Sequence, residues 1–295
     1  MSQRLFPPTP YVPTETIDVE APDGSRYRLF VAPAMSAPGP AGRPLLLVLD
    51  GYFYTPVLST VCRSRGFINA EIDEPHIVGI GYPSDDLEDW LLRRNRDLTP
   101  TVPAQEIEPG QDLSPHLWGG GDALLDLIES VILPRVCERW AVNRSKMALL
   151  GHSYGGLATL HAMFTRPQLF ASWIAISPSV WWEDGRVLQA EAESFLRALR
   201  GSGLAPRLFM ATGELEEKVP VHLPTWSYAT PEHLAAHKAY TRMLSRMLAL
   251  GEHLRAGAAG TGLVVQTRGL PGETHASTVF AALTPALDMA FAPAR

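Results

Sequence analysis

The chain has 295 residues, of which 46% are hydrophobic and 19% are charged, and its formal net charge is -6. Such a composition is typical of a globular protein with a sizeable core and excludes a disordered chain. The negative net charge argues against nucleic acid as a partner, because proteins that bind it need surplus Lys and Arg to displace counterions from phosphates. No stretch reaches the roughly 18 to 20 apolar residues that a membrane span requires.

The N-terminal residues and the two cysteines bear on the cellular compartment. Residues 1–8 contain no apolar segment followed by a small-residue cleavage site, so we expect no secretion signal. Cys62 and Cys137 lie far apart in the chain and belong to no CxxC or Cys-His pattern. We expect reduced, packed cysteines, with a disulfide as the alternative, and a cytoplasmic protein.

The first elements predict an antiparallel hairpin. Residues 16–21 and 25–32 alternate apolar and polar, and Asp23 and Gly24 lie in the turn between them. A loop rich in Pro, Ala and Gly follows. The sequence then changes to short, continuous apolar runs of the kind found in buried parallel strands. These runs lie at residues 45–49, 76–82, 146–150, 171–177, 207–212 and 263–267.

Helical patterns separate most of these runs, and the alternation predicts an α/β protein. One such pattern covers residues 122–140, where Pro134 should kink or break the helix. We expect a single α/β-hydrolase domain over residues 1–295, with a mostly parallel twisted sheet and helices on both faces. Two segments fit neither strand nor crossover. We expect a long loop over residues 84–115 and an insertion over the active site at about residues 217–257, with a helix that opens at Thr230.

Ser153 is the candidate nucleophile, because it is the central residue of Gly151-His152-Ser153-Tyr154-Gly155, a G-x-S-x-G motif. Three fixed residues are a weak signal alone. An apolar strand directly before the motif and a helical pattern directly after it strengthen the signal. A nucleophile elbow is a sharp strand-to-helix turn whose flanking glycines allow close approach of the chain. The context therefore predicts a serine hydrolase of the α/β-hydrolase fold.

The same fold orders its catalytic residues as nucleophile, acid and then histidine. His275 is the last histidine and follows the last predicted strand, so we expect it to be the general base. The acid should follow the preceding strand, where Glu214, Glu216 and Glu217 offer three carboxylates. We prefer Glu216, at the third place after Gly213, and leave the other two open.

Two backbone N–H groups should stabilise the oxyanion of the tetrahedral intermediate. Tyr154, directly after the nucleophile, should supply one of them. The other should come from the turn after residues 45–49, where Gly51 lets the chain cross the site. We expect the second donor to be the amide of Tyr52.

We expect neither a metal nor a cofactor. His233 and His237 are spaced i, i+4 on a predicted helix and could in principle share a metal ion. No further ligand stands at a recognisable spacing, so we interpret both as residues of a solvated or substrate-facing helix surface. Any iron should arrive as part of the substrate.

Several short motifs together resemble those of the putative-esterase branch of the α/β-hydrolases, which includes enterochelin esterase-like and salmochelin esterase-like siderophore hydrolases. The resemblance covers nearly the whole chain and rests on Leu49-Asp50-Gly51, Gly79-Ile80-Gly81-Tyr82-Pro83, Arg96-Asp97-Leu98-Thr99-Pro100-Thr101, Gly151-His152-Ser153-Tyr154-Gly155-Gly156, Ser177-Pro178-Ser179-Val180-Trp181-Trp182 and Gly213-Glu214-Leu215-Glu216. It implies cleavage of ester bonds in catechol-bearing trilactones, at times with iron bound, with Ser153 and His275 as the principal pair. Some members work close to a Ser-His dyad, which leaves the role of Glu216 open.

Local residues suit a catecholate substrate. Arg93, Arg94 and Arg96 cluster in the charged segment and could meet phenolate oxygens or an anionic ferric complex. Trp181 and Trp182 follow a predicted strand and could stack on aromatic rings. The alternatives are solvated arginines and tryptophans that belong to the core.

The first functional hypothesis is therefore a serine carboxylester hydrolase that opens a catecholate siderophore, such as an enterobactin-like trilactone, through an acyl-enzyme. Its partner would be this small-molecule ester or its iron complex. The second is a general small-acyl esterase or acyltransferase, because the same branch contains feruloyl esterases, formylglutathione hydrolases and mycolyltransferases. The third is a non-catalytic protein that holds a ligand on the same scaffold.

Overall fold

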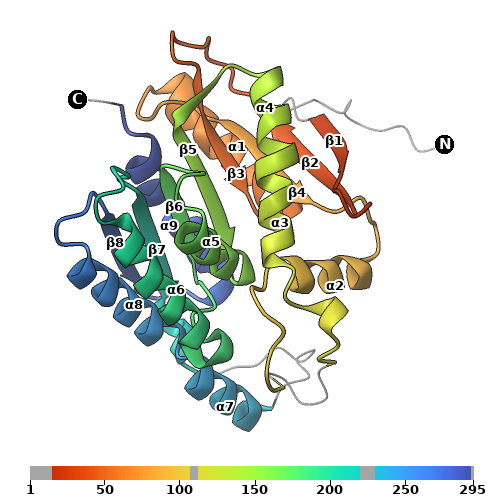
Figure 1. The fold of residues 1–295 in the computed structure, drawn as a ribbon, viewed down its shortest axis with the longest axis vertical. Coiled ribbons are helices and arrows are strands. Elements are labelled where there is room, and N and C mark those ends of the chain that lie inside the picture. Colours follow the sequence, from red (N-terminus) through yellow and green to blue (C-terminus); the bar gives the residue numbers. More distant parts are fainter. Residues whose placement is uncertain (1–14, 107–111, 220–229, 294–295) are drawn as a thin grey trace.

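The computed structural model describes residues 15–106, 112–219 and 230–293. One sheet, with strand order β1-β2-β4-β3-β5-β6-β7-β8, runs through this part of the chain (Figure 1). The strands are β1 (Glu15–Glu20), β2 (Arg26–Ala32), β3 (Arg43–Val48), β4 (His76–Gly81), β5 (Val142–His152), β6 (Ser172–Ile176), β7 (Arg207–Gly213) and β8 (Val264–Leu270). The β1–β2 and β2–β4 pairs are antiparallel and all others are parallel, which confirms the predicted hairpin and the mostly parallel sheet.

Helices cover both faces of the sheet (Figure 1). They are α1 (Gly51–Cys62), α2 (Leu87–Asp97), α3 (Gly121–Leu127), α4 (Leu133–Arg139), α5 (Tyr154–Thr165), α6 (Arg186–Leu199), α7 (Pro231–Thr241), α8 (Met243–Gly257) and α9 (His275–Phe291). Because side chains alternate along a strand, Leu45 and Leu47 of β3 pack into one core layer with α3, α5, α6 and α8. Leu46 and Val48 pack into the other layer with α1 and α9. Burial on both faces explains why these strands are continuously apolar.

The two cysteines are free, as the sequence predicts. Cys62 is the last residue of α1 and faces the core layer beneath this helix, and burial raises the pKa of its thiol to about 12. None of the described helices is long and apolar enough to cross a membrane.

The prediction of a long loop over residues 84–115 is wrong for residues 87–97, which form α2. Asp86 caps this helix by accepting a hydrogen bond from the backbone N–H of Glu88 at 2.9 Å. Acidic residues occupy the first turn, and Arg94 and Arg96 occupy the last, so the charges oppose the helix dipole at both ends. The charge pattern that suggested a loop is therefore the pattern of a capped helix. Residues 107–111 of the expected loop lie outside the described part.

The irregularity expected near Pro134 lies just before it. A π-helical segment, Ile128–Ile132, joins α3 to α4, and Pro134 stands in the first turn of α4. A proline ring crowds the carbonyl four residues earlier, which here belongs to Ser130 inside the π segment. The wider π turn gives that carbonyl room.

The insertion expected at about residues 217–257 is only partly an insertion. The helix predicted to open at Thr230 is α7, and Thr230 caps it by accepting from the N–H of His233 at 3.2 Å. The following helix, α8, packs on β7 and β8 and is the crossover between these two strands. Residues 220–229 lie outside the described part, so α7 is the described segment added beside the site.

Candidate active site

The G-x-S-x-G motif forms a sharp turn between β5 and α5, as the sequence predicts. Ser153 stands in this turn with φ of 61° and ψ of -119°, a conformation that non-glycine residues rarely adopt. Its N–H donates to the carbonyl of Ile176 on β6 at 3.0 Å, and its own carbonyl accepts from Leu157 at 3.0 Å in the first turn of α5. The strained residue is thus held from both sides, which is the arrangement of a nucleophile elbow.

Close packing requires glycine at Gly151, the first residue of the motif, and at Gly156, directly after it. A Cβ on Gly151 would lie 2.0 Å from the carbonyl oxygen of Gly155, and a Cβ on Gly156 would lie 2.8 Å from the Cα of Pro178. Both clashes are with backbone, so they cannot be relieved by a side-chain rotation. The turn can therefore be this tight only with glycine at these positions.

Glu216 and His275 meet beside this turn. His275 is the first residue of α9, and its Nδ1 lies 2.7 Å from Oε2 of Glu216, which follows β7. A carboxylate only accepts, so Nδ1 carries the proton and Nε2 is left as the basic nitrogen. The other oxygen of Glu216 accepts from Ser177 Oγ at 2.6 Å, from the Gly213 N–H at 2.7 Å and from Thr278 Oγ1 at 3.1 Å. Glu216 is thereby fixed in the orientation that holds the imidazole.

The hydrogen bonds to Glu216 also keep it ionised. Burial raises its pKa, but the hydrogen bond and charge of His275, with the bonds from Ser177 and Gly213, outweigh that effect and lower the pKa overall. The two neighbouring carboxylates have other partners. Glu214 pairs with Lys218 on the surface, and Glu217 accepts from the N–H and Oγ of Ser245 on α8 at 2.6 and 2.8 Å. Of the three candidates, Glu216 is the one that contacts His275.

A cavity of about 360 Å³, here called the active-site cavity, opens beside these residues. It is lined by Ser153, Tyr154, Ser179, Trp181, Glu216, His237, Lys238, Thr241, Met243 and His275. Three of the lining residues, His237, Lys238 and Thr241, come from α7. Lys238 Nζ donates to the carbonyls of Leu215 and Glu216 at 3.3 and 2.9 Å, which ties α7 to the turn that carries the acid. The sequence placed His237 on a substrate-side or solvated face but gave no sign of Lys238.

His152 is a second histidine at the site, and no sequence pattern predicted a role for it. Its Nε2 donates to the backbone carbonyl of His275 at 2.9 Å, and its Nδ1 accepts from the hydroxyl of Tyr54 at 2.9 Å. The two imidazole rings lie 4.6 Å apart between centroids. Burial, followed by the charge of His275, lowers the pKa of His152 to about 3. His152 is therefore neutral at neutral pH and positions the backbone of His275 without competing for its proton.

The turn after β3, which carries the expected oxyanion donor Tyr52, is held by a buried ion pair. Asp50 has φ of 55° and precedes the first turn of α1, where Gly51 and Tyr52 lie. Arg94 donates to both carboxylate oxygens of Asp50, each at 2.8 Å, from Nε and Nη2. The same Nη2 lies 3.5 Å from the carbonyl oxygen of His152. Burial lowers the pKa of Arg94, but the charge and hydrogen bonds of Asp50 raise it more. Arg94 thus joins the turn of Tyr52 to the nucleophile turn.

The structure separates the residues expected to bind substrate. Arg94 is committed to Asp50, and Arg96 binds Asp97 at 2.7 Å and the hydroxyl of Tyr27 at 3.2 Å, away from the cavity lining. Trp181 lines the active-site cavity. Trp182 does not, because it is fully buried and donates to Thr101 Oγ1 at 2.9 Å. It belongs to the core, which was the alternative interpretation.

Comparison with known proteins agrees with this geometry. Residues 24–242 match the model of a family described as "Putative esterase". A siderophore triacetylfusarinine C esterase of Aspergillus fumigatus is 32% identical over 96% of this chain and 95% of its own. The ferri-bacillibactin esterase BesA of Bacillus subtilis is 28% identical over 65% of this chain and 66% of its own.

Two solved structures from Aspergillus nidulans superpose over nearly the full chain. The siderophore hydrolase EstA has a TM-score of 0.81 and 26% identity, with 97% of each chain covered. The siderophore hydrolase EstB has a TM-score of 0.78 and 29% identity, with 97% of this chain and 98% of its own covered. The α/β-hydrolase fold predicted from the sequence is thereby confirmed.

Proposed function

Because the chain belongs to the Putative esterase family and has the α/β-hydrolase fold, we propose that it is an esterase that hydrolyses ester bonds of a siderophore, with Ser153 as nucleophile. The observation that carries the mechanism is the 2.7 Å bond between Glu216 and His275 in the cavity that Ser153 also lines. The siderophore as substrate is supported by the relatives, which include esterases named for triacetylfusarinine C, ferri-bacillibactin and enterobactin.

The reaction proceeds in two halves. His275 Nε2 takes the proton of Ser153 Oγ as this oxygen attacks the ester carbonyl carbon. The tetrahedral intermediate collapses, the ester C–O bond breaks, and the leaving alkoxide takes the proton back from His275. A water molecule then attacks the acyl-Ser153 ester by the same route, which releases the carboxylic acid and restores the serine. Glu216 stabilises the imidazolium that forms in each half.

The oxyanion is stabilised by the backbone amides of Tyr52 and Tyr154. Each residue lies in the first turn of a helix, α1 and α5 respectively, where the helix dipole presents its positive end. The ion pair between Arg94 and Asp50 fixes the first of these turns relative to the second. Arg94 therefore acts on the reaction through the backbone that it positions, rather than through the substrate contact that the sequence suggested.

A catecholate trilactone of the enterobactin type is the first substrate to test. Wild-type enzyme should open this trilactone with a kcat/KM well above its value for p-nitrophenyl acetate, and Ser153→Ala should abolish both reactions. Triacetylfusarinine C serves as the comparison siderophore. Rapid cleavage of p-nitrophenyl acetate without turnover of either siderophore would instead identify a general small-acyl esterase. The measurement is product formation by liquid chromatography under matched conditions.

A further inference from the structure

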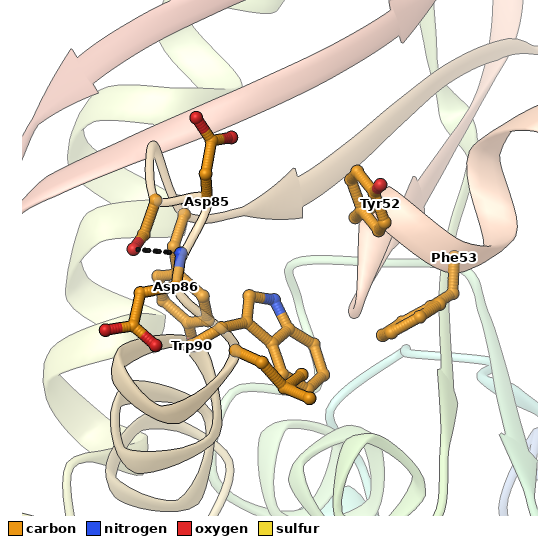
Figure 2. Close-up of a pocket in the computed structure, with 8 residues that line it drawn as sticks. Tyr52, Phe53, Asp85, Asp86 and Trp90 are labelled. Carbon is orange, nitrogen blue, oxygen red and sulfur yellow. Dashed lines mark hydrogen bonds between the residues drawn. The ribbon is translucent and has the colours of Figure 1, made fainter.

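A second cavity lies beside the Tyr52 turn and shares no lining residue with the active-site cavity, and no step of the mechanism uses it (Figure 2). This cavity, here called the arm pocket, has a volume of about 290 Å³. It is lined by Tyr52, Phe53, Tyr82, Ser84, Asp85, Asp86, Leu87 and Trp90. Its walls come from the start of α1, the loop between β4 and α2, and the start of α2.

One wall of the arm pocket is aromatic. Tyr52 packs edge to face on Phe53 at 5.5 Å between ring centroids, and Phe53 packs in the same way on Trp90 at 5.1 Å. Tyr52 and Phe53 nevertheless remain 64% and 48% exposed. A group of large rings left open to solvent beside an active site is a feature of ligand-binding surfaces, since a flat ligand can stack on it.

The arm pocket and the active-site cavity are linked through Arg94, which lies near one lining residue of each. The guanidinium carbon of Arg94 lies 5.7 Å from the ring centroid of Trp90, which lines the arm pocket. The same atom lies 5.7 Å from the ring centroid of Tyr154, which lines the active-site cavity. Tyr52, the expected oxyanion donor, is itself part of the arm-pocket wall. A ligand whose ester lies at Ser153 would have to pass Tyr52 to place another of its groups in the arm pocket.

The size of each cavity favours a shared ligand. Pockets that hold a whole small molecule span roughly 300–1,000 Å³, and the two cavities here, about 290 and 360 Å³, lie at the lower end of that range. Each has room for one arm of a siderophore, but a three-armed trilactone exceeds either one alone. A substrate of this class would have to distribute its arms between them.

The charge of the arm pocket limits which arm can enter. Among the described residues that line it, Asp85 and Asp86 are carboxylates and none is Lys or Arg. The Asp86 carboxylate already accepts from the Glu88 N–H at the start of α2, whereas Asp85 does not cap this helix. Figure 2 shows both side chains at the arm pocket. A neutral catechol can donate hydrogen bonds to a carboxylate, while a deprotonated, iron-bound catecholate is repelled by it.

We propose that the arm pocket is a second subsite that binds one ring-bearing, hydrogen-bond-donating and uncharged arm of a multi-armed siderophore ester, as a catechol is before it binds iron. This inference rests on the proposed function. It assigns specificity to Tyr52, Phe53 and Trp90 through ring stacking, and to Asp85 through charge. With this subsite, the iron-free ester is a better substrate than its ferric complex.

Phe53→Ala tests the stacking wall, with Phe67→Ala as a matched control. Phe67 is equally exposed, at 48%, and lies outside the lining of both cavities. The substrates are iron-free enterobactin and a single-armed ester, the methyl ester of N-(2,3-dihydroxybenzoyl)serine. Phe53→Ala should lower kcat/KM for enterobactin about three- to tenfold, the usual range for one lost aromatic contact. The single-armed ester, which needs only the active-site cavity, should keep its kcat/KM within about twofold.

Asp85→Asn tests the charge, with Glu88→Gln as the control that removes a nearby charge outside the pocket lining. The ratio of kcat/KM for ferric over iron-free enterobactin should rise about two- to fivefold in Asp85→Asn, in the range of one exposed charge interaction, and less in Glu88→Gln.

Equal effects of Phe53→Ala on both substrates, or no effect on either, would overturn the subsite while the proposed function stands. If wild-type enzyme cleaves the single-armed ester but no trilactone, the siderophore function itself is wrong.

Discussion

Replacing Ser153 by Ala should lower kcat for ester hydrolysis by on the order of 10⁴- to 10⁶-fold, because it removes the attacking oxygen and leaves only binding and the oxyanion donors. The fold should persist, since the Ser153 bonds seen in the turn are made by its backbone. Steady-state hydrolysis of the trilactone and of p-nitrophenyl acetate, with circular dichroism to verify folding, measures the effect.

A graded series separates the roles of the triad members. His275→Ala should approach the loss seen for Ser153→Ala, while Glu216→Gln should cost less, on the order of 10²- to 10⁴-fold. Glu217→Gln is the matched control, because Glu217 is the next residue and bonds Ser245 rather than His275. If Glu216→Gln retained full activity, the enzyme would work as a Ser-His dyad. If Glu217→Gln lost as much as Glu216→Gln, the loss would reflect damage to the turn.

The second large effect concerns stability. Arg94→Met should lower the free energy of unfolding by about 3–5 kcal/mol, the usual cost of leaving a buried charge unpaired. The side chains of Asp50 and Arg94 are only 5% and 14% exposed, so water cannot replace the lost partner. Because Asp50 directly precedes the turn of Tyr52, kcat should fall as well. Urea unfolding followed by tryptophan fluorescence gives the change in free energy.

Two controls show whether this loss comes from the unpaired charge. Asp50→Asn combined with Arg94→Met should recover part of the stability, because the double variant buries no lone ion. Arg28→Met breaks a bidentate pair with Asp18 of similar geometry, at 2.7 and 2.9 Å, on the exposed hairpin. That loss should stay at or below about 1 kcal/mol. Equal losses for Arg28→Met and Arg94→Met would contradict the role given to burial.

Sequence patterns predicted the sheet well and the segments between its strands less well. Strands buried on both faces, such as β3 and the second half of β5, are continuous apolar runs, so the sequence marks them clearly. The helix α2 was taken for a loop because its charges and the prolines that follow it outweighed the Asp86 cap and the acid-to-base order of its turns. The π segment before Pro134 depends on how the helix relieves a local clash. No periodicity in the sequence predicts whether a π turn or a kink forms there.

That the candidate catalytic residues come together could be predicted from the sequence for a topological reason. The carboxyl ends of parallel strands lie at one edge of a sheet, so residues that follow β5, β7 and β8 come together there. The substrate residues depend on partners distant in the sequence. Arg94 bonds to Asp50, and Trp182 bonds to Thr101. No local sequence pattern predicts either pair. Lys238 and Tyr54 were missed for the same reason, because their roles arise only from tertiary contacts.

The reaction of the wild-type enzyme with diisopropyl fluorophosphate tests the central claim most directly. The reagent should add one diisopropyl phosphoryl group per chain, peptide mass spectrometry should place it on Ser153, and hydrolysis of the trilactone should fall in proportion to the labelled fraction. His275→Ala should label much more slowly, because the serine then lacks its base. Full siderophore hydrolysis by completely labelled enzyme, or a label on a residue other than Ser153, would contradict Ser153 as the nucleophile.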